Sequence, residues 1–517
     1  MKMMITFALA PLAVLFSASL AFANPQLLTA EQWQADLERL DEAIRSGHPR
    51  PFRGGKEATY SGLVDTLNKD IAALGDKDII VRLAEIVALI SDGHTRLSIP
   101  RQHPEIGLEF GHAGTPLPDI AGLAFRQLPV TFEQFDDGIF IVAASAEHAS
   151  LIGARLEAID DTAAGDAMDT VQRITFAENA QLMKLMGADR LSLPEALVTL
   201  GIAKRSDGVT LKLTDAIGST ETLSVEPLPA GAITWTGPEF STDMPLRLEN
   251  PDLKFWWRYL PEEKTVYAQV NEITDADIKL AQFVARVIAE AEHRGAKLVI
   301  DLRSNFGGRG DLNRTFELAL IQSRDLNQYG RTFILTGRRT FSAAQMLINM
   351  LEKYTRVLFV GEPTGARPDH YGDARKTRLK NSGLTLRVSS LHWSSQHGND
   401  EREANNPDLP APWTSQAFFA GRDPALEMVF TSGPHSFKSL TRAAIQRDDH
   451  YQIARYMTHA ILSPDTHGDD LSKIYLALGK EFVEEGALDF ASFAFRYGLY
   501  LYPDDADLKA EFAKMKD

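Results

Sequence analysis

The sequence predicts an α/β protein whose central sheet is mostly parallel and covered by helices on both faces. Four near-continuous apolar runs, TVYAQV, KLVIDL, RTFILT and RVLFVGE, follow one another between positions 265 and 362. Such runs are typical of strands that are buried on both faces. Segments with helical periodicity, at 275–294, 312–322 and 343–353, alternate with these runs, which favours crossover units on one sheet. The length of 517 residues exceeds what one hydrophobic core usually organises, so further domains are expected.

Residues 1–23 have the pattern of a secretory signal peptide. Met1 and Lys2 precede an apolar stretch that ends in AFA at 21–23. The alternative is a membrane-anchoring helix, since about 20 apolar residues can span a bilayer, but Pro11 and the small-residue ending favour cleavage after Ala23. The chain has no cysteine, which excludes a lipidated cysteine anchor, disulfides and thiolate chemistry. We expect a periplasmic or secreted protein with no membrane segment after cleavage.

Residues 24–104 are predicted to form a helical N-terminal domain. In AEQWQADLERLDEAI the apolar side chains recur at three- and four-residue spacing, which indicates an amphipathic helix: Trp33, Leu37, Leu40 and Ile44. Two further amphipathic segments follow, and the last of them ends in the loop SDGHTRL.

Residues 105–235 are predicted to form a β-rich domain with a helical insertion at 178–202. The short runs PVTFEQF, GIFIVAAS, ARLEAID and VTLKLTD are bounded by glycine, aspartate and proline. The stretch LIGARLEAIDDTAAGDAMDTV resembles a PDZ-type module, which binds extended peptide ends at a sheet edge. A generic β-rich domain is the alternative.

The α/β core is assigned to 236–437, and a helical segment to 438–517. In the latter, LSKIYLALGKEFVEEGALDFASFAFRYGLYLYPDDADL resembles one tetratricopeptide-type helical hairpin. A single hairpin of this type cannot form a solenoid by itself, so we expect it to dock on the core.

The composition excludes several classes of function. A formal net charge of −16 and a pI near 5.3 argue against nucleic acid or an anionic membrane as a partner. The Walker and G-x-G-x-x-G patterns of nucleotide binding are absent. The 13 histidines include no H-E-x-x-H motif and no close cluster, so we expect neither a catalytic metal nor another cofactor.

Ser342 is the first candidate for a reacting group. In RRTFSAAQMLINML a strand is predicted to end near Thr336, and Ser342 then opens a helix. A hydroxyl there lies at the positive end of the helix dipole, and the unpaired NH of Ala343 can stabilise an oxyanion. The alternative is a serine that only caps the helix, which is the commoner role for a serine at that position.

A glycine pair follows a second buried strand. In LVIDLRSNFGGRGDL the strand runs into Gly307 and Gly308 and then into a helix. Paired glycines allow a close backbone approach and a turn that directs NH groups at a ligand.

Together these segments resemble the tail-specific protease, or carboxy-terminal processing peptidase, family. The family order of a strand with DLRxNxGG, an SAAE-like serine helix and a VGExTxG strand is matched by VIDLRSNFGG, TFSAAQ and LFVGEPTG. The resemblance implies a Clp-protease/crotonase-like core and hydrolysis of peptide bonds without a cofactor. It also implies that Ser342 is the nucleophile, and that the NH groups of Ala343 and of Gly307 or Gly308 form the oxyanion hole.

The general base differs from that of the best-known family members. They carry a lysine soon after the VGExTxG motif, where this chain has Ala366 and Arg367. Arginine stays protonated in proteins and cannot act as a general base. A Ser–Lys dyad is therefore not expected.

A tricorn-like branch of the family uses Ser–His–Glu instead. Its histidine lies upstream in a short acidic motif, which SDGHTRL matches with His94. His370 and His392 are rivals for the base, because both follow Ser342 closely in sequence.

The glutamate of that branch lies six residues before the proline of a Pro-Asp pair. Counting back from Pro407 gives Glu401, and a shift in register would give Asp400 or Glu403. An acidic partner would hold the imidazole tautomer and stabilise its charged form.

Three classes of function remain open. The first is an exported serine peptidase that acts on proteins or peptides through an acyl-enzyme on Ser342. The second is a catalytically inactive, peptide-binding or scaffold homologue, and the third is an esterase-type serine hydrolase. An ordinary α/β-hydrolase is disfavoured because no G-x-S-x-G motif is present.

Overall fold

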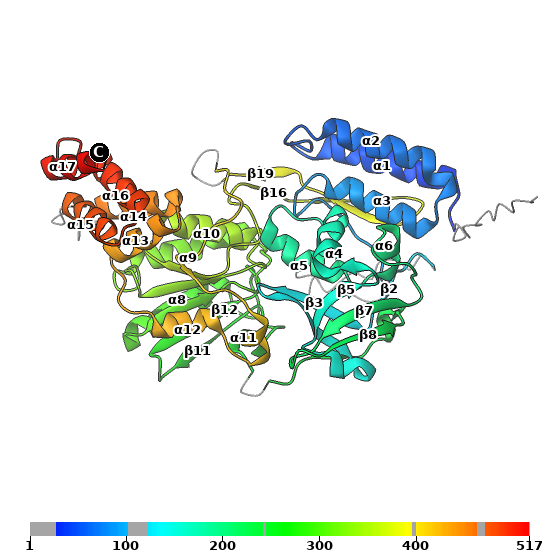
Figure 1. The fold of residues 1–517 in the computed structure, drawn as a ribbon, viewed down its shortest axis with the longest axis horizontal. Helices are drawn as coiled ribbons and strands as arrows, with labels where there is room; N and C mark the ends of the chain where they lie inside the picture. Colours follow the sequence, from blue (N-terminus) through cyan, green and yellow to red (C-terminus); the bar gives the residue numbers. More distant parts are fainter. Residues whose placement is uncertain (1–26, 102–121, 241–243, 395–399, 463–470, 516–517) are drawn as a thin grey trace, which may run out of the picture.

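The computed structural model describes residues 27–101, 122–240, 244–394, 400–462 and 471–515. The predicted signal peptide, 1–23, lies outside the described residues. The molecule has two halves that lie side by side in Figure 1: an α/β half with the C-terminal helices, and a half that contains the N-terminal helices and the β-rich segment.

The centre of the α/β half is a six-stranded sheet of order β11-β12-β13-β14-β15-β20. Strand β11 is antiparallel to β12, and all other neighbours in this sheet are parallel. The strands are β11 (Phe255–Leu260), β12 (Thr265–Val270), β13 (Lys297–Asp301), β14 (Thr332–Thr336), β15 (Leu358–Gly361) and β20 (Leu409–Pro410). The predicted mostly parallel α/β sheet is confirmed, and its four central strands are the four apolar runs of the sequence.

Helices cover both faces of this sheet, which explains why its strands carry apolar residues on both sides. In β12, Val266 packs with the helices on one face, whereas Tyr267 packs with the C-terminal helices on the other. The first face is covered by α8 (Leu280–Arg294), α9 (Arg314–Gln322) and α10 (Ala343–Tyr354). Helix α8 begins five residues later than expected, and a 3₁₀ turn, Gly310–Asn313, precedes α9.

The second face is covered by the short helix α12 and by the C-terminal helical segment. Helices α11 (Ser415–Phe419) and α12 (Pro424–Thr431) were not predicted, and they lie before α13 (Phe437–Gln446), α14 (His450–Leu462), α15 (Leu471–Glu484), α16 (Leu488–Leu501) and α17 (Ala506–Lys514). Helices α15 and α16 approach closely at Gly479, where an added Cβ would lie 2.2 Å from the Phe495 ring. The expected docking of these helices on the core is observed, because their buried side chains share one cluster with the sheet.

The other half begins with α1 (Ala30–Gly47), α2 (Glu57–Asp70) and α3 (Asp76–Ala88). Thr29 starts α1 with a capping box, and Trp33, Leu37, Leu40 and Ile44 form its buried stripe as predicted. The loop after α3 carries His94 and leads into β1 (Arg96–Leu97).

The β-rich segment contains a seven-stranded sheet with the path β10-β4-β5-β7-β8, on which β3 pairs with β4 and β6 with β5. Its strands are β3 (Val130–Phe135), β4 (Gly138–Ser145), β5 (Arg155–Ile159), β6 (Thr162–Ala163), β7 (Val209–Thr214), β8 (Thr220–Val225) and β10 (Trp235–Thr236). Strands β2 (Arg126–Gln127) and β9 (Leu228–Pro229) form a separate pair. The segment also contains α4 (Ala164–Val171), α5 (Ala180–Arg190) and α6 (Pro194–Thr199), of which α5 and α6 occupy the predicted insertion. A short helix, α7 (Leu246–Glu249), precedes the core sheet.

One segment of the α/β half crosses to the N-terminal helices, and we call residues 370–394 the crossover segment. It contains β16 (His370–Gly372), β17 (Arg375–Arg378), β18 (Thr385–Val388) and β19 (Leu391–Trp393). Strand β18 pairs antiparallel with β1, and β16 pairs with β19 in the space between the halves (Figure 1). Leu379, Leu384, Leu386 and Val388 belong to the same apolar core as the N-terminal helices. The crossover segment therefore ties the loop of His94 to the α/β half.

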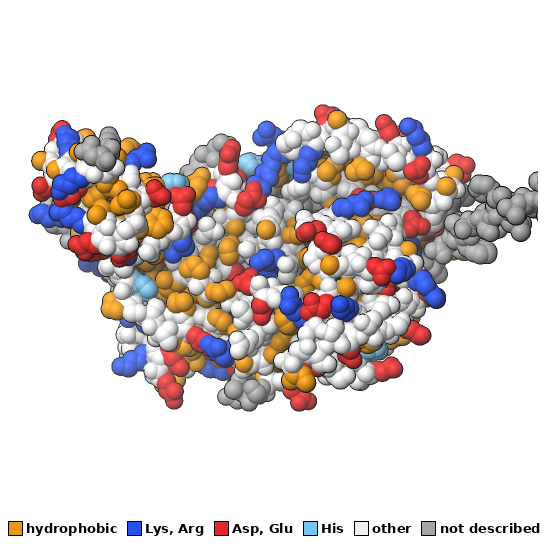
Figure 2. All heavy atoms as spheres, viewed as in Figure 1, with side chains coloured by type: hydrophobic (Ala, Val, Ile, Leu, Met, Phe, Trp, Pro, Cys, Tyr) orange, Lys and Arg blue, Asp and Glu red, His pale blue; other side chains and the backbone are white. Residues whose placement is uncertain are grey.

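Within the described ranges, no helix is both long and apolar enough to cross a bilayer. Acidic and basic side chains are interspersed over the face shown in Figure 2.

Candidate active site

Ser342 occupies a strained turn between β14 and α10. Its backbone angles, φ 54° and ψ −121°, lie in a region that residues other than glycine rarely adopt. Its side chain makes no capping hydrogen bond to the helix, so it does not act as an ordinary cap. A serine held on a sharp strand-to-helix turn presents its hydroxyl outward, as nucleophilic serines of hydrolases do.

The structure brings His94 to this serine. His94 Nε2 lies 2.9 Å from Ser342 Oγ, within hydrogen-bond distance, although the two residues are 248 positions apart. The two rival histidines lie elsewhere. His370 is buried with its ring centroid 6.0 Å from that of His94, and His392 is exposed on β19, where its ring contacts Tyr371.

The His94 ring is buried and packs on an aromatic side chain. It stacks on Phe341, the residue before Ser342, with ring centroids 4.4 Å apart. Burial lowers the pKa of His94 below its ordinary value, and nearby Asp92 opposes this shift in part. The imidazole is therefore neutral near pH 7 and able to accept a proton.

Asp92 organises the loop that carries His94. Its Oδ1 accepts a hydrogen bond from the His94 backbone NH at 3.0 Å. Its Oδ2 accepts from the hydroxyls of Thr95 and Ser389, both at 2.6 Å, and lies 3.2 Å from His48 Nε2. The Asp92 side chain is wholly buried, so one carboxylate joins the end of α1, the His94 loop and the crossover segment.

Gly307 and Gly308 form the turn that faces Ser342. An added Cβ at Gly307, which has φ 113°, would lie 2.7 Å from Ser342 Cβ and 2.8 Å from the Ala343 nitrogen. The Gly307 NH already donates to Asn305 Oδ1 at 2.8 Å. The Ile273 NH donates to the Gly307 carbonyl, and the Ile273 carbonyl accepts from the Arg309 NH. Because residues alternate in direction along such a pairing, the Gly308 NH between them points away from Ile273. Of the two glycines, Gly308 is thus the one with an available NH.

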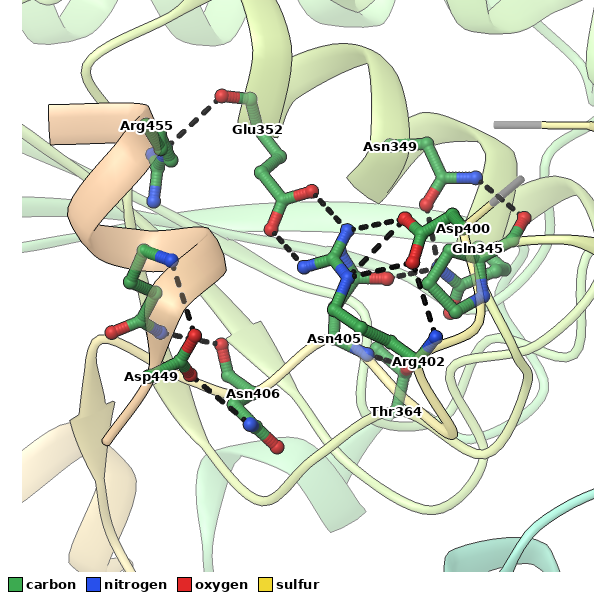
Figure 3. Close-up of polar contacts among 12 residues, drawn as sticks. Gln345, Asn349, Glu352, Thr364, Asp400, Arg402, Asn405, Asn406, Asp449 and Arg455 are labelled. Atoms are coloured by element: carbon green, nitrogen blue, oxygen red, sulfur yellow. Dashed lines mark hydrogen bonds and ion pairs between the residues drawn. The ribbon is translucent and has the colours of Figure 1, made fainter. Parts of the chain in front are cut away.

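Glu401 lies on an exposed part of a loop whose neighbouring residues are tightly held. Asp400 is buried and paired with Arg402, which also forms a two-pronged ion pair with Glu352 of α10 (Figure 3). Glu403 pairs with Arg367. Both alternative acids of the sequence analysis are therefore engaged by arginines.

The Glu401 loop is also fastened to the helix that begins at Ser342. Gln345 of α10 donates to Asn405 Oδ1 at 2.5 Å, and the Asn405 NH donates to Thr364 Oγ1 at 3.1 Å. Figure 3 shows these contacts beside the Arg402 ion pairs. One end of α10 thus carries the serine while its side carries the loop of Glu401.

The position compared with a catalytic lysine in the sequence analysis is apolar here. Ala366 is fully buried in a cluster with Phe341 and with side chains around α5, namely Phe176, Leu182, Leu185 and Met186. Arg367 donates to the carbonyl of Glu178 as well as pairing with Glu403. Neither residue can serve as a base for Ser342.

Sequence reasoning missed three residues around the His94 loop. Asp92 stands in the SDGHTRL motif that singled out His94, so its position was visible but its buried role was not. The sequence indicates His48, in HPRPF, only as a residue that ends the first helix, and Ser389 lies far from the motif and gave no signal. In the described part of the chain, no group of histidine and acidic side chains could hold a metal ion.

Comparison with known proteins gives a fold likeness. No family model and no curated protein matches the sequence. Among solved structures, mature CPAF complexed with lactacystin is 14% identical, with a TM-score of 0.53, and the likeness covers 77% of this chain and 97% of that one. Mature CPAF alone gives the same identity and TM-score, covering 77% and 96%. A serine-to-alanine mutant of CPAF is 12% identical with a TM-score of 0.53, covering 79% and 99%. The chain therefore shares the fold of CPAF over most of its length.

Proposed function

We propose that this protein is a serine peptidase of the tail-specific protease family that cleaves peptide bonds through an acyl-enzyme on Ser342. The observation that carries the proposal is the 2.9 Å contact between His94 Nε2 and the hydroxyl of a serine in a strained strand-to-helix turn. A nucleophile and a base within hydrogen-bond reach define this class of chemistry.

In the first half of the reaction, Ser342 Oγ attacks the carbonyl carbon of the scissile bond while its proton passes to His94 Nε2. The same nitrogen then returns the proton to the leaving amine as the carbon–nitrogen bond breaks. A water molecule repeats these steps on the ester and releases the acid. His94 is suited to this role because burial keeps its imidazole neutral in the resting state.

The NH groups of Gly308 and Ala343 are proposed to bind the oxyanion. Ala343 is the first residue of α10, and the NH groups at a helix start lack partners within the helix. Glycine is proposed to be required at position 307 because the Cβ of any other residue would collide with Ser342 and Ala343. Donors fixed before reaction stabilise developing charge without reorganisation.

Glu401 is proposed as the third member of the triad, by the family resemblance. The support from the fold is indirect: the arginine and amide contacts around Asp400 and Asn405 hold its loop against the serine helix. The β-rich segment is proposed to present protein or peptide substrates, as a PDZ-type module would.

Labelling with a fluorophosphonate probe tests the proposal. The mature protein should be labelled, Ser342→Ala and His94→Ala should not be, and Glu401→Ala should be labelled more slowly. Absence of labelling in a folded wild-type protein would favour the peptide-binding scaffold. Cleavage of casein or a peptide library, against cleavage of small esters alone, separates the peptidase from the esterase.

Export to the periplasm or the medium is proposed from the first 23 residues. The expected result is that the protein purified from an expressing bacterium begins at Asn24 and is released with the periplasmic or extracellular fraction. N-terminal sequencing of that material checks both points, and an intact Met1 in cytoplasmic extract would contradict the proposal.

A further inference from the structure

His94, the base of the proposed reaction, has an unusual environment at the ring nitrogen that faces away from Ser342. In a Ser–His–acid triad, the acid normally accepts a hydrogen bond from the histidine nitrogen that faces away from the serine. Among the described residues, His94 Nδ1 is buried and has no hydrogen-bond partner. In this structure the proposed triad acid, Glu401, makes no hydrogen bond to this nitrogen, so the ring must be oriented and its charged form stabilised by another group as well.

Asp92 is the acidic group that the fold has built next to this base. Its carboxylate accepts hydrogen bonds from the His94 backbone NH, from two hydroxyls and from His48. The Arg50 NH donates to His48 Nδ1, so the proton of His48 is on Nε2 and points at Asp92. Four donors around one buried carboxylate are the arrangement of a permanent anion.

Asp92 stays ionised although it is buried. Burial alone would raise the pKa of Asp92, but the bond from His48, the nearby His94 and the hydroxyls of Ser389 and Thr95 outweigh it and hold the pKa below its ordinary value. Around His94, the remaining charged or titratable neighbours are His370, Arg96 and Arg387, all of which disfavour a positive imidazole. The buried carboxyl of Glu178 also faces Asp92, and burial raises its pKa, which favours the neutral form.

We infer that Asp92 is the positioning residue of this site: it fixes His94 through the loop backbone and stabilises the imidazolium that forms when His94 takes the Ser342 proton. This inference rests on the proposed function, and it assigns to Asp92 the electrostatic part of a triad acid. Asp92 is buried, so it acts on the reaction through His94 and does not touch the substrate. Its effect should therefore fall on kcat and leave KM unchanged.

The first test compares Asp92→Asn with wild type in fluorophosphonate labelling and ester hydrolysis. Asparagine keeps an oxygen for the His94 NH but removes the negative charge. We expect the labelling rate at pH 8 to fall by about tenfold or more, less than the roughly 10⁴-fold loss for a triad acid in direct contact, with KM unchanged. A rate within twofold of wild type would overturn the inference.

The second test uses Ser389→Ala, which removes one donor to Asp92 and leaves the charge in place. Losing this donor raises the pKa of Asp92, so the anion is lost at a higher pH during acidification. The acid limb of the rate–pH profile should move to higher pH, with the rate at pH 8 within about threefold of wild type. A purely structural role would lower the rate at every pH and leave the acid limb in place, which would overturn the inference even if Asp92→Asn did not fold. Failure of wild type to label would instead refute the proposed function.

Discussion

At the scale of single residues, Gly307 is a position in the turn beside Ser342 where only glycine fits. Its φ of 113° and the 2.7 Å approach of an added Cβ to Ser342 Cβ require glycine for two independent reasons. The positive φ of Ser342 adds backbone strain at the place where the two chemical motifs meet.

Gly307→Ala is expected to abolish labelling of Ser342. The added methyl group must displace Ser342 or the Ala343 NH, and a shift of about 1 Å at a reacting group can cost 10²-fold in rate. The matched control is Gly153→Ala, at φ 93° with no atom within 4 Å of the added Cβ. Both variants bear backbone strain, so equal labelling of the two would show that the close approach at Gly307 has no role.

The residue scale also shows what sequence could predict about the site. Ser342, His94 and the glycine pair stand in short motifs whose residue types suit acyl transfer, and the structure brings them together. The choice between Gly307 and Gly308 depended on the side chain of Asn305, which stands in the DLRxNxGG motif although the motif does not show that it accepts the Gly307 NH. The catalytic roles of Ser342, His94 and Glu401 remain predictions.

At the scale of elements, the crossover segment is the part that sequence patterns did not predict. The strands of the central sheet are apolar runs, whereas β17 and β18 have four residues each, and β17 carries only charged and polar side chains. Strand β18 pairs with β1 and packs in the core of the N-terminal helices, more than 250 positions away, and no local pattern encodes such a pairing.

Asp36→Ala should loosen the crossover segment. The buried Asp36 of α1 accepts bonds from the NH groups of Asn381 and Ser382, at 3.1 and 2.7 Å, at the turn between β17 and β18. Leaving these donors unsatisfied costs about 1–3 kcal/mol. Thermal unfolding and hydrogen exchange of β18 measure the effect. The control is Asp41→Ala, which breaks an i,i+4 pair with Arg45 on the same helix and should change stability by less than about 0.5 kcal/mol. Unchanged exchange in β18 would contradict the prediction.

Arg402→Gln should release the Glu401 loop from the serine helix. The substitution leaves Asp400 and Glu352 without their cation in a buried setting, a loss of about 3–5 kcal/mol for breaking such a network. Labelling should slow because the loop no longer packs on α10. Arg422→Gln, which removes an exposed pair with Glu427, serves as the control and should cost less than about 1 kcal/mol. Chemical denaturation compares them, and equal losses would refute the argument.

At the scale of the whole molecule, buried histidines link stability to pH. Burial lowers the pKa of His94 and of His370, and it lowers that of His459 to about 3. In the unfolded chain each histidine binds a proton below about pH 6.5, whereas in the folded protein it binds one only at a lower pH. The unfolded state therefore binds more protons, and stability falls as the pH drops below about 6.5.

The melting temperature should decrease steadily between pH 7 and pH 5. Each such histidine can contribute up to about 1.4 kcal/mol per pH unit in this range. Glu178, whose pKa burial raises, works in the opposite direction but is a single group. His459→Gln removes one of the three histidines and should flatten the dependence. A melting temperature that is constant from pH 7 to pH 5 would contradict the assignment of buried neutral histidines.

The crossover segment also sets the order in which the site becomes complete. Synthesis runs from the amino end, so a nascent chain contains His94 and Ser342 before it contains β18 and Ser389. Until then β1 has no partner strand and Asp92 lacks one of its four donors. His94 and Ser342 are therefore both made before the segment that joins their two halves, and the site is complete only once residue 389 has been synthesised.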